Sequence, residues 1–134
     1  MTPTGIVIHC SATKDDDEST INAAVIDRWH RDIGWDSIGY HFVITRQGIL
    51  EKGRDENIRG AHAHGHNDKI GICLVGTDNF NRVQITKLVE TLIHLLDKYE
   101  WTPEDIYCHR DFSNKECPGF SSEMIRSFLY MLDH

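Results

Sequence analysis

The spacing of apolar positions changes regularly along the chain, which predicts alternating strands and helices. Short apolar runs predict strands at 5–9, 40–46, 49–52, 70–75 and 106–109. Apolar residues that recur every three or four positions predict helices at 20–33, 83–99 and 121–132. We therefore expect an α/β fold in a single domain, 1–134, with a mixed central β-sheet of about five strands flanked by about three helices.

Residues at the element ends support these assignments. Asn81 is a good N-cap for the longest helix, and Gly34 provides a stop for the first one. Gln47 and Gly48 separate two strand-like runs and predict a hairpin.

Composition and charge exclude two classes of partner. The formal net charge is −7, whereas a nucleic-acid-binding protein needs a basic patch. No apolar stretch approaches the roughly 20 residues that span a membrane. The first residues lack the basic and apolar regions of a signal peptide, so we expect synthesis in the cytoplasm without one.

Two groups of residues are expected to have structural roles only. The acidic run 15–18 is interpreted as a solvated loop, because it lacks the ligand spacing of a calcium site. The four cysteines are expected to be free thiols, because the chain starts like a cytoplasmic protein and three of them lie in apolar runs.

Strand alternation places two histidines on the same side of the predicted sheet. Neighbouring side chains of a strand point to opposite faces, so His9 opposes Cys10 and His109 opposes Cys108. If both histidines face a cleft, both cysteines enter the core. Two histidines at strand ends are candidate ligands for a metal ion.

Cys117 is the candidate third ligand, because the loop that follows His109 is long enough to return to the metal. Three protein ligands leave a fourth zinc position open for a reactive water. Lys115 lies two residues earlier and could stabilise an oxyanion there. The alternatives are a surface loop with an incidental cysteine and a solvated lysine, or a cysteine hydrolase that uses Cys117 with His109.

Two further residues are candidates for contacts with a substrate. Tyr40 opens a predicted strand, and its phenol could orient water or substrate, although the pattern by itself favours a core or edge tyrosine. The segment 60–66 holds three histidines, but the nearest acid is Asp68, so a second metal site is not favoured. His62 is the best candidate for substrate binding because it borders the strand 70–75.

Five segments in order resemble a known family: VIHCSAT at 7–13, GYHF at 39–42, GAHA at 60–63, IGICLVG at 70–76, and the loop 109–119. The chain resembles the type-2 N-acetylmuramoyl-L-alanine amidases, especially the zinc "lysozymes" of T-odd phages, and more distantly the peptidoglycan recognition proteins. The resemblance covers nearly the whole chain and implies one catalytic domain, without a separate cell-wall-binding domain.

The resemblance implies one Zn²⁺ held by His9, His109 and Cys117, with Tyr40 and Lys115 assisting catalysis. The implied reaction is hydrolysis of the amide between the lactyl group of N-acetylmuramic acid and L-alanine of the peptidoglycan stem peptide. The implied biology is a phage endolysin released through holin-type pores. A non-catalytic peptidoglycan-binding module and a cytoplasmic amidase that recycles muropeptides are the alternatives.

Other expectations concern partners. Phage members of the family inhibit RNA polymerase through an N-terminal extension, whereas here the first strand is predicted to begin almost at once, which argues against that second function. We expect a monomer that binds peptidoglycan or muropeptide, with no nucleic-acid or membrane partner.

Overall fold

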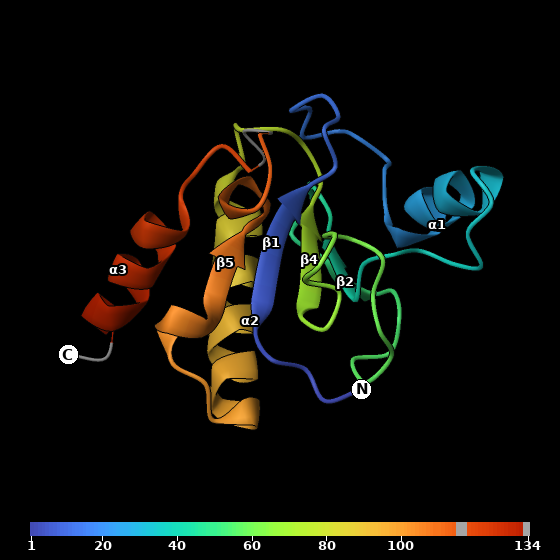
Figure 1. Ribbon diagram of the computed structural model, residues 1–134. Coiled ribbons are helices and arrows are strands. Elements are labelled where there is room, and N and C mark those ends of the chain that lie inside the picture. The colour runs from blue at the N-terminus through green and yellow to red at the C-terminus, as the bar shows by residue number, and fades with distance from the viewer. Residues whose placement is uncertain (115–117, 133–134) are drawn as a thin grey trace.

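Five strands form one mixed sheet in the order β3-β2-β4-β1-β5 (Figure 1). The computed structural model describes residues 1–114 and 118–132. Its elements are, in chain order, β1 (Ile6–Cys10), α1 (Ala23–Asp32), β2 (Phe42–Ile44), β3 (Leu50–Lys52), β4 (Ile70–Leu74), α2 (Arg82–Tyr99), the 3₁₀ turn η1 (Pro103–Asp105), β5 (Ile106–Cys108), the 3₁₀ turn η2 (His109–Asp111) and α3 (Ser122–Leu132).

The directions of the four strand pairings decide where the polar loops meet. β1 runs parallel to β4 and β5, and β2 runs parallel to β4, whereas β3 is antiparallel to β2. The carboxyl ends of four strands therefore lie at one edge of the sheet, and the loops that follow them are neighbours. This end of the sheet carries His9 and His109, two of the residues predicted to hold the metal.

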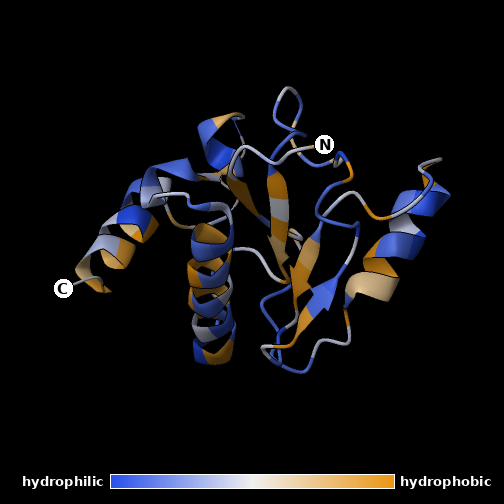
Figure 2. Cartoon of the chain, turned by 90° about the horizontal axis from the view of Figure 1, so that it is seen from below, coloured by the Kyte–Doolittle hydropathy of each residue, from blue (hydrophilic) through white to orange (hydrophobic). Residues whose placement is uncertain are grey.

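Helices cover both faces of the sheet. On one face, Leu88 and Leu92 of α2 and Ile125 of α3 pack against Ile8 and other fully buried strand residues. On the opposite face, Ile26 of α1 packs with a smaller cluster that includes Val43 and Cys73. Figure 2 shows the largely apolar strands between α2 and α1, and both helices mix hydrophilic and apolar residues along their length. Within residues 1–114 and 118–132, no helix is both long and apolar enough to cross a bilayer.

The predicted fold class is confirmed, with small shifts in the element ends. Asn81 caps α2 as predicted, by accepting a hydrogen bond from the backbone N–H of Gln84. The helix expected at 20–33 begins later, at Ala23, because the Asn22 side chain caps it. The strand expected at 40–46 is shorter, and the segment after it forms the predicted hairpin, in which the N–H of Gly48 bonds to the carbonyl of Thr45.

The expectation for the cysteines is only partly confirmed. Cys73 and Cys108 are buried free thiols. Cys10 is disulfide-bonded, so the prediction of a free thiol is wrong for that residue.

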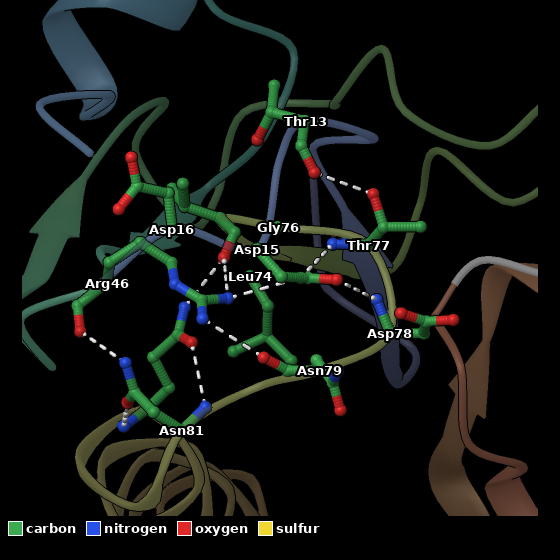
Figure 3. Close-up of polar contacts among 12 residues, drawn as sticks. Thr13, Asp15, Asp16, Arg46, Leu74, Gly76, Thr77, Asp78, Asn79 and Asn81 are labelled. Carbon is green, nitrogen blue, oxygen red and sulfur yellow. Dashed lines mark hydrogen bonds and ion pairs between the residues drawn. The ribbon is translucent and has the colours of Figure 1, made fainter. Parts of the chain in front are cut away.

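The acidic run is not simply a solvated loop, because the carboxylates of Asp15 and Asp17 bind the buried Arg46. Figure 3 labels Arg46 and Asp15. Arg46 follows β2, and only 2% of its side chain is exposed. Its guanidinium donates to Asp17 at 2.8 Å and to Asp15 at 3.3 Å. The amide of Asn81 also donates to Asp17, at 2.9 Å. We call Arg46, Asp15, Asp17 and Asn81 the arginine cluster; it ties the loop after β1 to the start of α2.

Candidate metal centre and active site

Two histidines lie side by side at the ends of neighbouring parallel strands. Ile8 of β1 pairs with Cys108 of β5, so the next residue of each chain segment, His9 and His109, falls at the same level of the sheet edge. Their ring centroids are 4.5 Å apart. The alternate positions, Cys10 and Cys108, are buried, as strand alternation predicted.

A third histidine contacts the first one from a loop. Nε2 of His9 lies 2.9 Å from Nδ1 of His62. Nε2 of His62 lies 2.8 Å from the carbonyl oxygen of Lys69. Both ring nitrogens of His62 are thus within hydrogen-bond distance of a protein atom. We call His9, His62 and His109 the histidine cluster.

Burial keeps two of these imidazoles neutral at pH 7. Burial lowers the pKa of His9 well below its usual value, and the neighbouring His62 and His109 lower it further. Burial is also the main cause that lowers the pKa of His62 to about 4. A neutral imidazole carries a nitrogen lone pair, which is the form that binds a metal ion.

Tyr40 borders the cluster from the segment that leads into β2. Its ring centroid is 5.1 Å from that of His9. Burial raises the pKa of its phenol well above the usual value, and the contact with Cys73 adds to this shift. The phenol therefore stays protonated at neutral pH and can donate a hydrogen bond to a group in the site.

The donor set fits zinc as far as it is described. Zinc accepts imidazole nitrogen, and His9 is buried, neutral and next to a second histidine. Among residues 1–114 and 118–132, no three His, Cys, Asp or Glu side chains group closely enough to hold a metal ion. The predicted third ligand, Cys117, and the predicted catalytic Lys115 lie outside the described residues.

Comparison with known proteins decides the family. The N-acetylmuramoyl-L-alanine amidase family model matches residues 1–120. The chain belongs to this amidase family. The endolysin of Enterobacteria phage T3 is 41% identical, over 89% of this chain and 82% of that protein. The endolysin of Escherichia phage T7 is 40% identical, over 86% of this chain and 80% of the phage protein.

Solved structures agree with the family. The amidase endolysin LysCS from Clostridium intestinale superimposes with a TM-score of 0.84 and 33% identity, over 97% of this chain and 85% of that one. The ectodomain complex of peptidoglycan recognition proteins LCa and LCx, bound to tracheal cytotoxin, gives a TM-score of 0.79 and 29% identity, over 94% of this chain and 82% of that one. The protein is an endolysin-type amidase that acts on peptidoglycan.

The amidase also positions its cluster through residues that the sequence did not single out. The side-chain oxygen of Asn67 accepts hydrogen bonds from the backbone N–H groups of His62 and Ala63, at 2.8 and 2.9 Å. The ring of His41 accepts from the N–H of Gly71 at 3.0 Å. An Asn five residues after a histidine predicts nothing by itself, so only the folded loop reveals this role.

Proposed function

We propose that the amidase hydrolyses the bond between the lactyl group of N-acetylmuramic acid and L-alanine with one zinc ion held by His9, His109 and Cys117. The observation that supports this most is the pairing of His9 and His109 at two strand ends, with His9 buried and neutral. Burying a neutral imidazole against two others is costly without a ligand that uses its lone pair.

Each remaining group then has a role that follows from its chemistry. When bound, zinc supplies Lewis acidity that polarises the amide carbonyl and activates water. The protonated phenol of Tyr40 donates a hydrogen bond that orients water or the carbonyl. Lys115 would supply, in the role that the family resemblance implies, a positive charge that stabilises the oxyanion. Substrate contact by His62 stays a prediction.

The polar surroundings of the site suit a glycopeptide. A cavity of about 310 Å³ is lined by Thr77, Asp78, Arg110 and Gly119, and Arg110 directly follows His109 in the chain. Its charged and hydroxyl groups can hydrogen-bond to sugar or stem peptide.

The metal assignment is tested by zinc content and by activity. The protein is purified under reducing conditions, because zinc binds a thiolate. Wild type should retain one zinc ion per chain, and Cys117→Ser should lose both zinc and cleavage of purified peptidoglycan. A chelator should abolish activity and added zinc should restore it; persistent activity without metal would favour a cysteine hydrolase instead. A folded, zinc-loaded protein that cleaves nothing would indicate a binding module.

We further propose that the amidase acts as a phage endolysin, a monomer that reaches the wall through holin-type pores. Mass spectrometry of products from intact sacculi and from soluble muropeptides separates this role from muropeptide recycling. An endolysin should release stem peptides from sacculi, whereas a recycling enzyme should cleave only the soluble fragments.

A further inference from the structure

Hydrogen-bond chemistry fixes the tautomer of His62. The carbonyl oxygen of Lys69 can only accept a hydrogen bond, so Nε2 of His62, 2.8 Å away, must carry the hydrogen. In a neutral imidazole the other ring nitrogen then carries the lone pair. Nδ1 of His62 is therefore an acceptor.

The tautomer of His62 in turn fixes the tautomer of His9. Because Nδ1 of His62 accepts, Nε2 of His9, 2.9 Å away, must donate its hydrogen. The lone pair of His9 is then on Nδ1. The carbonyl of Lys69 thus determines, through one intervening imidazole, which nitrogen of His9 can bind a metal ion.

The ring of His62 is also held in a close-fitting slot. A Cβ atom added to Gly60 would lie 2.5 Å from Cδ2 of His62, and one added to Gly71 would lie 2.6 Å from its Cγ. Both distances are far shorter than a van der Waals contact, so two glycine backbones enclose the ring. Asn67 additionally holds the backbone of His62. The ring cannot easily turn away from His9.

We propose that His62 is a positioning residue that fixes the tautomer and the orientation of His9, so that Nδ1 of His9 is the metal-binding nitrogen. This inference rests on the proposed zinc site. It differs from the substrate contact expected from the sequence, because both ring nitrogens of His62 are already used inside the protein. Such outer partners of metal-binding histidines orient the ring and make it a better ligand.

The test compares three variants of the full chain. His62→Leu removes the acceptor and keeps an apolar side chain in the slot. His62→Asn keeps an oxygen acceptor close to the position of Nδ1. His64→Leu is the matched control, because His64 is an exposed histidine of the same loop. Zinc affinity is measured by competition with a chromophoric chelator, and the tautomer of His9 by long-range ¹H–¹⁵N NMR of the metal-free protein.

We expect His62→Leu to weaken zinc binding by roughly 10–100-fold, which is typical of a lost outer partner of a ligand. The NMR spectrum should show His9 with hydrogen on Nε2 in wild type and a mixture of tautomers in His62→Leu. His62→Asn should recover most of the affinity, and His64→Leu should match wild type. If His62→Leu does not fold, the proposal is tested by the zinc affinity of His62→Asn relative to wild type and by the tautomer of His9 in wild type.

Two results would overturn the proposal. One is hydrogen on Nδ1 of His9 in the metal-free wild type. The other is a His62→Leu variant with unchanged zinc affinity and tautomer but a raised KM, as a substrate contact would give. If wild type binds no zinc at all, the proposed metal site fails, while the tautomer measurement still decides the role of His62.

Discussion

The histidine cluster and the arginine cluster are two polar groups at the same end of one sheet, each built around a buried side chain, His9 or Arg46, yet their charges are balanced differently. Arg46 meets two carboxylates and also donates to the carbonyl oxygens of Val75 and Asn79. His9, by contrast, contacts aromatic rings and other imidazoles. In the arginine cluster a positive charge is balanced by carboxylates. In the histidine cluster the buried imidazoles are neutral and offer nitrogen lone pairs.

This difference separates a structural role from a chemical one. A buried cation with hydrogen-bonded partners of opposite charge holds loops in place and needs no further ligand. Neutral imidazoles whose pKa values burial has lowered are poised to accept a cation, and such perturbed groups mark functional sites. The two clusters should therefore respond to different changes: the arginine cluster in stability, the histidine cluster in metal binding and catalysis.

The largest expected effect is on catalysis. Tyr40→Phe keeps the ring beside His9 and removes the hydrogen that the phenol can donate. Removing one such donor lowers kcat by about 10²–10³-fold. Turnover is measured with purified peptidoglycan, and zinc content should stay at the wild-type level. Wild-type turnover in this variant would show that the phenol takes no part in the chemistry.

The next effect should fall on stability alone. Arg46→Met removes the guanidinium and, with it, the hydrogen bonds to Asp15 and to the carbonyl oxygens of Val75 and Asn79. Asp15 and Val75 keep other donors, from the backbone of Thr77 and the side chain of Gln84. The free energy of unfolding should fall by about 2 kcal/mol, because a buried charged group loses its hydrogen bonds while the carboxylates that remain can still be solvated. Urea unfolding gives this value. Zinc affinity per folded molecule should not change, and a large loss of affinity would mean that the two clusters are not separate.

The two clusters should lose their contributions to folding stability at different pH values. An unfolded histidine binds a proton near pH 6.5, whereas folded His62 does so only at about 4. Between these values the unfolded chain binds more protons, so the metal-free protein loses stability as pH falls from 6.5 to 4, by about 3 kcal/mol from His62 alone. His62→Leu should lose this dependence, as urea unfolding at pH 7 and pH 4 can show.

The arginine cluster should respond only at lower pH. The hydrogen bonds from Asn81 and Arg46 lower the pKa of Asp17. Burial raises the pKa of Asp15, but hydrogen bonds from the backbone of Thr77 and its neighbours lower it by more. Both carboxylates therefore stabilise the fold above their usual pKa of 3.8, and this contribution is lost below it. If stability fell in a single step centred near pH 3, the assignment of the stability loss between pH 6.5 and 4 to His62 would be wrong.

The smallest effect concerns a contact that joins the two loops of the histidine cluster. His66 stacks on Phe112 with centroids 3.6 Å apart and an angle of 11° between the rings. Phe112→Leu should lower the unfolding free energy by about 1 kcal/mol. His66→Phe is the matched control, since Nδ1 of His66 has no hydrogen-bond partner among the described residues. Thermal unfolding should find the control as stable as wild type.

The local pattern predicted most of the fold because each element carries its own signal. The apolar runs of β1 and β4 and the stripe of α2 are buried as expected. The pattern was least reliable before β2. There, Tyr40 and His41 were expected in the strand, but β2 begins only at Phe42. Burial looks the same in a regular strand and in the extended segment leading into it, so apolar spacing cannot separate them.

The sequence by itself determined the strands, the helices and the positions of His9 and His109 directly at the ends of two strands. Only the tertiary structure decided that His62, of three histidines in its loop, meets His9, and that Arg46 meets Asp15 and Asp17. These contacts join residues about 30 to 50 positions apart. The physical reason is that strand order brings distant loops together, whereas apolar spacing reports only which face of its own element a residue occupies.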